Sequence, residues 1–416
     1  MTNAEEAPTA VAGSCRWPPA LRWSWIPTSA DGIIAAEKRL LSLVKTGYVQ
    51  EKVNIGFAPT GSKARWFRSS EEPRFINTVT FGSSKENAPT LVMVHGYGAS
   101  HGLFFRNYDA LASRFRVIAI DQLGWGGSSR PDFICKSTEE TDAWFIDSFE
   151  EWRKAKNLNN FILLGHSLGG YVAAKYALQH PEHVQHLILV GPAGFSPEVD
   201  DSAERLAKFR GTWKGMLVNH LWESNFTPSK ILRGLGPWGP YFVRRYTTTR
   251  FGSYSTGELL TKHESILLTD YIYHTLVSKA SGELCLNYTF SLGAFARKPL
   301  LKSASDWKVP TTFIYGQDDW MNYQGAQQAR KDMTVPCEII RVPHVCLFSS
   351  MPIYTLRLRS TILVLPTNAL ATMQGGHLEF IENPSGFNSA VLYACRNFLS
   401  EDVGDDFSRP DGLIYA

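Results

Sequence analysis

Residues 161–178 read FILLGHSLGGYVAAKYAL, and this stretch decides the fold. A short apolar run leads into Gly165-His166-Ser167-Leu168-Gly169, and a segment typical of a helix follows. This is the strand, turn and helix pattern of a nucleophile elbow. In such a turn the serine takes a strained conformation with positive φ, and the flanking glycines leave room for it. The stretch therefore predicts acyl chemistry on Ser167.

A serine hydroxyl needs an imidazole to take its proton and a carboxylate to orient that imidazole. With this kind of elbow the chain order is serine, acid, histidine. We predict Asp319 as the acid, because it stands three residues after the glycine that ends an apolar run, and Asp318 is the alternative. We predict His377 as the base, because two glycines precede it and a helix signal follows. The alternative for His377 is an ordinary histidine in a surface loop.

Negative charge develops on the substrate carbonyl oxygen during acyl transfer, so the site needs two backbone N–H donors. We predict the N–H of Leu168, directly after the nucleophile, and the N–H of Tyr97 in the turn His95-Gly96-Tyr97-Gly98. The glycine-rich loop 121–129 has no helix N-terminus at phosphate-binding spacing, so we do not interpret it as a phosphate loop. The pattern predicts neither a metal nor a bound cofactor.

Apolar runs alternate with helical segments from Thr78 onward, which predicts an α/β fold with a mostly parallel sheet flanked by helices. The runs are continuous, as expected for strands buried on both faces. They lie at 90–94, 116–120, 161–164, 186–190, 311–315 and 337–341. Residues 197–301 look helical and aromatic instead, and we interpret them as a cap across the strand ends, where ligands bind. Arg244, Arg245 and Arg250 indicate a solvated helix face, with a phosphate headgroup as the alternative.

The composition bounds the class of protein. With 416 residues and 44% hydrophobic content, the chain can form one enlarged catalytic domain. The formal net charge is +3 and the basic residues are scattered, which argues against a nucleic-acid partner. Six cysteines without C-x-x-C spacing and the lack of a signal sequence favour reduced thiols in the cytoplasm. No apolar run approaches the roughly 18 residues of a membrane span, so we expect a soluble or peripherally attached protein.

Shifts in composition also predict the organisation of the chain. Three tryptophans, Trp17, Trp23 and Trp25, stand beside arginines in a proline-broken segment, which suits a lipid surface, with packing onto the domain surface as the alternative. The predicted divisions are a disordered tail at 1–14, the Trp-rich segment at 15–70, core at 71–196, the cap at 197–301, core at 302–400 and a C-terminal tail at 401–416.

Five motifs together are similar to those of the α/β-hydrolase family. They are His95-Gly96, the loop 121–129, GHSLGG at 165–170, HLILVGPAGF at 186–195 and YGQDDWM at 315–321. Within that family the chain most resembles the branch of the Chanarin-Dorfman lipid-droplet protein and its plant counterparts. The likeness covers roughly residues 15–344 and 375–400.

The resemblance implies a glycerolipid acyl hydrolase at lipid droplets or membranes, and also a lysophosphatidic acid acyltransferase with acyl-CoA as co-substrate. The acyltransferase activity is attributed in the family to an H-x4-D motif, but here His377 is followed at that spacing by Glu382, and His186 by Gly191. Some animal relatives lack the serine, so a scaffold that recruits a lipase or transporter stays open. A hydrolase of small soluble esters is the third reading.

Residues 345–374 depart from the family pattern. Relatives run from a form like R-V-P-x almost directly into G-G-H, whereas here these 30 residues intervene without Asp, Glu or Gly. The insert preserves the reading frame and its ends could encode intron boundaries, so we interpret it as a retained intron or a misannotated splice. The alternative is a long surface loop. Because of the insert, His344 becomes an alternative to His377 as the base.

Overall fold

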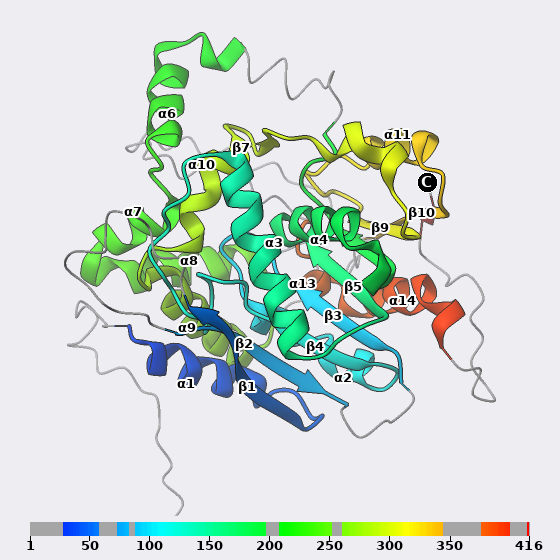
Figure 1. Cartoon of the computed structure of the whole chain (residues 1–416). Coiled ribbons are helices and arrows are strands. Elements are labelled where there is room, and N and C mark those ends of the chain that lie inside the picture. The colour runs from blue at the N-terminus through cyan, green and yellow to red at the C-terminus, as the bar shows by residue number, and fades with distance from the viewer. Residues whose placement is uncertain are drawn as a thin grey trace, which may run out of the picture.

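A nine-stranded sheet forms the centre of the protein (Figure 1), in the order β1-β2-β4-β3-β5-β6-β9-β10-β11. The computed structural model describes residues 28–57, 73–82, 88–196, 208–251, 260–343, 376–399 and 414–415. In chain order the strands of this sheet are β1 (Tyr48–Phe57), β2 (Pro73–Phe81), β3 (Thr90–Val94), β4 (Arg116–Ile120), β5 (Phe161–His166), β6 (Val184–Val190), β9 (Thr311–Gly316), β10 (Cys337–Val342) and β11 (Ile414–Tyr415).

The sheet is mostly parallel, which confirms the predicted fold class. Strands β4, β3, β5, β6, β9 and β10 run in parallel, whereas β1, β2 and β11 are antiparallel to their neighbours. All six predicted apolar runs are strands, and β5 continues two residues further, through His166. Their carboxyl ends therefore meet at one edge of the sheet, where ligands bind in folds of this kind.

Side chains of the central strands alternate between two hydrophobic cores. In β3, Leu91 and Met93 belong to one core, and Val92 and Val94 belong to the other. All four side chains are almost fully buried. The continuous apolar runs are thus explained by helices that cover both faces of the sheet.

Helices from different parts of the chain cover the two faces. The long helices α3 and α4 contribute to one core, and α1, α2 and α14 contribute to the other. The bounds of the helices outside the cap are α1 (Ala30–Leu41), α2 (Tyr108–Ala112), α3 (Thr138–Ala155), α4 (Leu168–Gln179), α11 (Gln324–Asp332), α13 (Glu379–Glu382) and α14 (Pro384–Ala394), with 3-10 turns η2 (His101–Phe104), η3 (Pro181–His183), η6 (Leu300–Asp306) and η7 (Arg396–Phe398).

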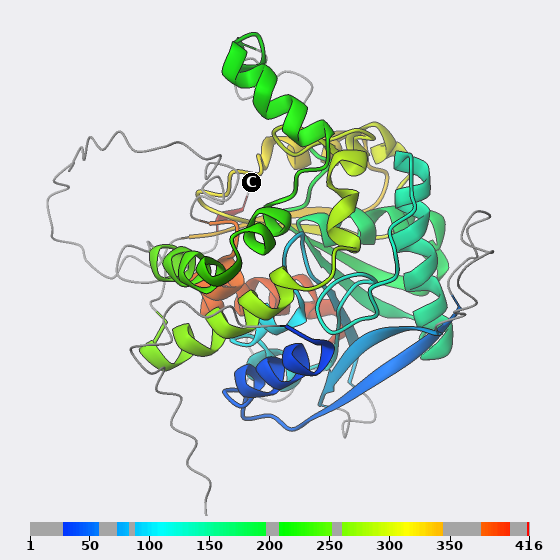
Figure 2. The same ribbon diagram turned by 90° about the vertical axis from the view of Figure 1, so that its left-hand side faces the viewer.

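The segment after β6 is helical, and its first described helix projects away from the rest of the molecule (Figure 2). Its elements are α6 (Trp213–Glu223), α7 (Pro228–Gly234), η4 (Gly236–Trp238), α8 (Gly239–Phe251), α9 (Lys262–Val277), η5 (Gly282–Cys285), α10 (Leu286–Thr289) and a small hairpin of β7 (Phe290–Ser291) and β8 (Phe295–Ala296). Helix α9 packs against α1, α7 and α8. The hydroxyl of Tyr271 in α9 accepts a hydrogen bond from Gly102 N at 3.3 Å, so α9 contacts the turn η2 that follows β3. The interpretation of residues 197–301 as a cap stays a prediction.

Helix α1 and strand β1 were not singled out by the sequence analysis, although both lie within residues 15–70. Strand β1 is an edge strand that pairs with β2, and buried and exposed residues alternate along it only over residues 52–56. The sheet and its first helix thus begin inside residues 15–70, which the sequence analysis set apart from the core as a Trp-rich segment. Trp17, Trp23, Trp25 and His344 lie outside the described residues, as does the insert 345–374.

The described cysteines and helices bear on where in the cell the protein acts. Cys135, Cys285, Cys337 and Cys395 are free thiols, and the two other cysteines lie outside the described residues. Among the described helices, none combines the length and apolar character needed to cross a membrane. Location in the cytoplasm stays a prediction.

A buried polar network joins helix α1 to the sheet. The imidazole of His101 lies 3.0 Å from the Glu37 carboxylate, and the His101 backbone N–H donates to Asp121 at 2.8 Å. The amide of Asn77 donates to both carboxylates, at 3.0 and 2.9 Å. Burial alone would lower the pKa of His101, but the nearby Glu37 and Asp121 carboxylates outweigh it and raise this pKa to about 9. The network therefore holds a protonated histidine between two acids.

This network predicts a loss of stability in mild alkali. Because the pKa of His101 is about 9 when folded and near 6.5 when unfolded, the folded state binds the extra proton between these values. The contribution is complete below pH 6.5 and disappears as the pH rises through about 9, and it amounts to about 3 kcal/mol. Urea unfolding of the wild type and of His101→Gln from pH 6 to 10 measures it. A constant difference between the two curves would contradict the assignment.

Candidate active site

Ser167 occupies a strained turn between β5 and α4. Its backbone has φ +53° and ψ −116°, the positive φ predicted for a nucleophile elbow. A Cβ atom on Gly165 would lie 2.4 Å from the carbonyl oxygen of Gly169, and one on Gly169 would lie 2.3 Å from that of His95. No side chain fits at either position. The glycines therefore hold the serine at the start of the helix, at the carboxyl end of a central strand.

Asp319 and His377 meet at the neighbouring strand ends. The Asp319 carboxylate, which follows β9, accepts a hydrogen bond from His377 Nδ1 at 2.8 Å, and the same oxygen accepts from Met321 N at 2.9 Å. The two side chains are buried, with exposed fractions of 1% and 2%. Asp318 is exposed instead. The structure thus brings the preferred acid, and not its alternative, to the preferred base.

Ser167 and His377 both lie against the end of β6. The Ser167 N–H donates to the carbonyl of Val190 at 2.9 Å. A Cβ on the next residue, Gly191, would lie 3.0 Å from His377 Nδ1 and 2.5 Å from Asp319 Oδ2. No hydrogen bond joins the Ser167 hydroxyl to the imidazole of His377 among the described contacts, and in unliganded sites of this type that bond is often long until substrate binds.

His166 contacts the turn that carries His377, a role that the sequence analysis did not assign. Its Nε2–H donates to the carbonyl of His377 at 2.9 Å, and the two rings lie 4.8 Å apart. Burial, and then the nearby His377, lowers the pKa of His166 well below the ordinary range, so its ring is neutral. The Trp320 ring lies 5.2 Å from His377. His166 occupies the variable position of the elbow motif, directly before the serine, and this position is the only feature of the sequence that could have indicated its role.

The two predicted oxyanion donors belong to segments that adjoin the serine. Leu168 is the first residue of α4, where backbone N–H groups and the helix dipole favour negative charge. A Cβ on Gly96, next to Tyr97, would lie 2.9 Å from the Ser167 Cβ, so this turn packs directly on the elbow. His95 fixes the turn by donating to the carbonyl of Gly96 at 2.8 Å. Burial lowers the pKa of His95 to about 4, which keeps the ring neutral.

Glu382 ties the histidine turn to the cap. One carboxylate oxygen accepts from the N–H of Gly376 at 2.8 Å, and the other forms an ion pair with Arg250 of α8. The side chains of Glu382 and Arg250 are 3% and 10% exposed. The Arg106 guanidinium adds a second link, because it donates to the carbonyl of Ile381 at 3.1 Å and to Glu264 of α9. The turn that carries His377 is thus held by two cap helices.

Glu379 places a neutral carboxyl group beside the site. It is 2% exposed, and neither of its oxygens has a hydrogen-bond partner in the described part of the chain. Burial, and then the nearby Asp319 carboxylate, raises the pKa of Glu379 well above the ordinary range. Its protonated form therefore adds no negative charge next to the acid that orients His377.

Within the part of the chain that the structure describes, two groups of side chains have ligand atoms close enough for a metal ion, but both already have other partners. The first is the Glu37, His101 and Asp121 network, in which the histidine is protonated. The second contains Glu150, whose carboxylate is held by two bonds from Arg153 at 2.8 Å. A protonated imidazole and an arginine-bound carboxylate are poor ligands.

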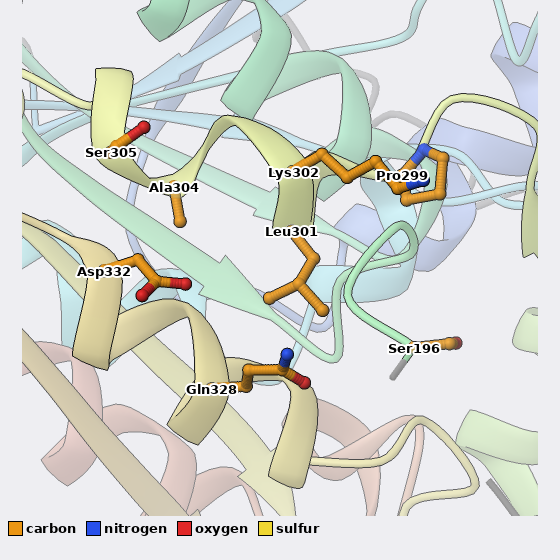
Figure 3. Close-up of a pocket in the computed structure, with 8 residues that line it drawn as sticks. All are labelled: Ser196, Pro299, Leu301, Lys302, Ala304, Ser305, Gln328 and Asp332. Atoms are coloured by element: carbon orange, nitrogen blue, oxygen red, sulfur yellow. The ribbon is translucent and has the colours of Figure 1, made fainter. Parts of the chain in front are cut away.

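A surface cavity lies away from this site. It has a volume of about 440 Å³ and opens between η6 and α11 (Figure 3). Its lining residues are Ser196, Pro299, Leu301, Lys302, Ala304, Ser305, Gln328 and Asp332. None of them belongs to the constellation around Ser167, so we do not assign the substrate to this cavity.

The chain belongs to the α/β-hydrolase family. A family model described as alpha/beta hydrolase fold matches residues 89–345, a span that contains Ser167 and Asp319. A solved carboxylesterase from Bacillus subtilis, CesB, superposes with a TM-score of 0.55 at 17% identity and covers 88% of this chain and 98% of its own. A bacterial membrane phospholipase A gives a TM-score of 0.57 at 17% identity, with 89% and 91% covered. At these identities the structures show the fold alone.

Curated relatives lie much closer in sequence. A rice protein named probable 1-acylglycerol-3-phosphate O-acyltransferase is 75% identical over 96% of this chain and 89% of its own. The Arabidopsis 1-acylglycerol-3-phosphate O-acyltransferase is 70% identical, with 95% and 87% covered. A mouse (lyso)-N-acylphosphatidylethanolamine lipase is 34% identical, with 71% and 80% covered. The rat ABHD5 protein, of the Chanarin-Dorfman type, is 31% identical over 95% and 98%, which confirms the resemblance to that branch.

Substitution of Glu382 is expected to lower both stability and turnover. In Glu382→Gln, Arg250 stays buried without its counter-charge, which costs about 3 kcal/mol of unfolding free energy. The kcat for a soluble ester is expected to fall about tenfold to hundredfold, because a small displacement of the histidine turn misplaces the base. Adding Arg250→Met removes the unpaired charge and is expected to restore part of the stability. Urea unfolding and steady-state kinetics measure these effects.

Glu150→Gln is the matched control. Glu150 also forms a buried pair with an arginine, Arg153 of α3, but it has no bond to the histidine turn. This variant is expected to lose stability while kcat stays unchanged. Equal losses of kcat in Glu150→Gln and Glu382→Gln would refute a positioning role for Glu382.

Removal of residues 345–374 is expected to leave the site intact. Asn383 donates to the carbonyl of Pro343 at 2.8 Å, and the preceding Glu382 accepts from Gly376 N, so both sides of the undescribed segment lie side by side. The deletion joins His344 to Gly375 and shortens the loop, which should stabilise the fold by about 2 kcal/mol. Urea unfolding and ester turnover test this. A folded deletion variant without turnover would show that the insert contributes to the site; its origin as a retained intron stays a prediction.

Proposed function

We propose that the protein is a serine acyl hydrolase of glycerolipids that also transfers the acyl group to a lysolipid. The observation that carries this proposal is the convergence of three features at one sheet edge. These are the strained turn at Ser167, the buried bond between Asp319 and His377, and the turn of Tyr97 packed on the elbow. Acyl transfer through a serine needs each of these parts.

In the proposed reaction, Ser167 Oγ attacks the ester carbonyl while His377 Nε2 takes its proton. Asp319 holds the opposite nitrogen of the ring and stabilises the imidazolium. The N–H groups of Leu168 and Tyr97 stabilise the oxyanion. His377 then returns the proton to the departing lysolipid oxygen, which leaves an acyl group on Ser167. In the second half, His377 activates the acceptor, and Ser167 is regenerated.

The nature of the acceptor decides between hydrolysis and transfer. Water gives a free fatty acid, and a lysophospholipid hydroxyl gives a diacyl product from the same acyl-enzyme. The relatives are named for both outcomes, a lipase and an acyltransferase, and this supports glycerolipids as the substrate class. Acyl-CoA could load Ser167 as a co-substrate by the same attack on its thioester.

Glu382 bears on the acyltransferase motif. In an H-x4-D motif the acid would orient the histidine, but His377 Nδ1 is bound by Asp319, and both oxygens of Glu382 have other partners. We therefore propose that hydrolysis and acyl transfer share the Ser167 site and that Glu382 acts only on the position of the turn. A separate acyltransferase site around His377 is the competing reading.

The proposed substrate requires contact with a lipid surface. We expect peripheral association with membranes or lipid droplets, to which Trp17, Trp23 and Trp25 would contribute through ring contacts with headgroups. A role as a scaffold for a lipase or transporter is the alternative from another class, and it needs no acyl-enzyme.

Ser167→Ala is expected to abolish ester hydrolysis, fluorophosphonate labelling and acyl-CoA-dependent acylation of lysophosphatidic acid. Each loss follows because the nucleophile that carries the acyl group is missing, and the fall in kcat should span several orders of magnitude. Mass spectrometry of a mixed lipid extract measures which species lose or gain an acyl chain. His377→Gln serves as the companion variant.

The outcomes separate the three readings. If acyl-CoA-dependent transfer survives in Ser167→Ala but disappears in His377→Gln, a separate acyltransferase site is correct. If purified wild type and Ser167→Ala give the same low turnover, while both stimulate an added lipase, the scaffold reading replaces the enzyme. Turnover of short esters alone, without any change in the lipid extract, would favour the small-ester hydrolase.

A further inference from the structure

The helix α6 exposes an apolar tip. Trp213, Met216 and Leu217 are 69%, 59% and 53% exposed, which is unusual for neighbouring large apolar side chains on one helix. The helix stands away from the sheet and its flanking helices in Figures 1 and 2. An exposed patch of this kind on a folded protein marks a contact surface.

The opposite end of α6 is fixed to the body of the cap. Trp222 Nε1 donates to the carbonyl of Phe290 at 3.0 Å, and Glu223 forms an ion pair with Arg297 at 2.8 Å. Asn287 also donates to the carbonyl of Glu223, at 2.9 Å. The helix therefore holds its apolar tip in a defined place relative to the β7–β8 hairpin.

The charge around this tip points to an anionic partner. Residues 208–217 contain Lys208, Arg210 and Lys214 and no acidic residue. Over the longer stretch 208–251 there are eight lysines and arginines and one acidic residue, Glu223, although the net charge of the whole chain is only +3. The basic residues, which are scattered over the chain as a whole, are thus locally concentrated in residues 208–251.

Cations and exposed aromatic rings also occur in pairs on the cap. The ammonium of Lys214 lies 5.6 Å from the Trp213 ring, and that of Lys230 lies 5.5 Å from the ring of Phe226, which is 40% exposed. An indole or phenyl ring beside a lysine suits the boundary between headgroups and acyl chains, where the ring enters the interface and the cation meets phosphate.

We propose that the tip of α6, formed by Trp213, Lys214, Met216 and Leu217, inserts into the surface of an anionic phospholipid membrane. It is a second lipid contact, separate from the N-terminal tryptophans, and it turns the cap toward the membrane. This proposal depends on the proposed function in one respect, namely that the substrate is a lipid. Binding itself needs no turnover, so it is tested without the active site.

The test measures flotation of the full chain with vesicles of phosphatidylcholine, with and without phosphatidylserine. The triple variant Trp213→Ala/Met216→Ala/Leu217→Ala is expected to bind at least a hundredfold more weakly to the anionic vesicles, because three apolar side chains that would enter the membrane surface are lost. Lys214→Gln is expected to weaken binding about fivefold and to reduce its dependence on salt. Binding of the triple variant equal to that of wild type would overturn the proposal.

The matched control is Val49→Ala/Phe57→Ala on β1. These two side chains are each 56% exposed but lie on the edge strand of the sheet, outside the cap. This variant is expected to bind vesicles like wild type. An equal loss of binding in it would mean that exposed apolar area in general, and not the α6 tip, is responsible, which also overturns the proposal.

Two further readouts keep the outcomes distinct. The triple variant is expected to hydrolyse a soluble short-chain ester like wild type and to lose activity only on substrate in vesicles. If wild type hydrolyses no ester at all, the proposed function is wrong, but the flotation result still tests binding of the α6 tip to the membrane. Sedimentation velocity tests the alternative occupant. If the triple variant loses a dimer that wild type forms, while vesicle binding is unchanged, the tip contacts a second copy of the chain and not lipid.

Discussion

The hydrogen bond between His377 and Asp319 is the contact on which the geometry of the site depends. It joins the end of β9 to a turn that the chain reaches only after residues 344–375, and both side chains are buried. The backbones meet just as closely, because a Cβ on Gly316 would lie 2.0 Å from the carbonyl oxygen of Gly376. Among the described residues, the contacts that place the base are made by residues before and after the insert. The 30-residue insert is thus compatible with a hydrogen bond between His377 and Asp319.

Buried charge places the elements around this site. The Glu382–Arg250 pair connects the histidine turn to α8, and the Glu37–His101 pair connects α1 to the sheet, while α1 also packs on α9. Desolvation offsets part of the attraction in such pairs, but breaking one leaves a buried charge without its partner and is costly. The pairs therefore also specify where the cap and the N-terminal helix lie. The hydrophobic cores supply the stability, and they are less selective about position.

Local patterns predicted the elements whose neighbours in sequence are also their neighbours in space. The strand, turn and helix around Ser167, the run before Asp319 and the glycines before His377 each show in a few residues. The missed parts depend on distant partners. The sequence shows Glu382 only as the residue at the acid position after His377, and its pairing with Arg250 is visible only in the structure. The pairing of Glu37 with His101 is likewise visible only there. Strand β1 mixes polar with apolar residues, and few of them are buried, so it lacks the continuous apolar run that marks the central strands.

The fate of the proposed acyl-enzyme depends on what reaches His377 before water does. This residue is 1% exposed, and the turn that carries it is bonded to cap helices, so an acceptor must approach past the cap. Residues 208–251 of the cap contain eight basic residues and one acidic residue, and such a surface raises the local concentration of an anionic lysolipid relative to neutral esters. Transfer would then be favoured when the cap lies on an anionic membrane that supplies acceptors, and hydrolysis when it does not. One site can thus produce both activities, selected by the surface that the cap contacts.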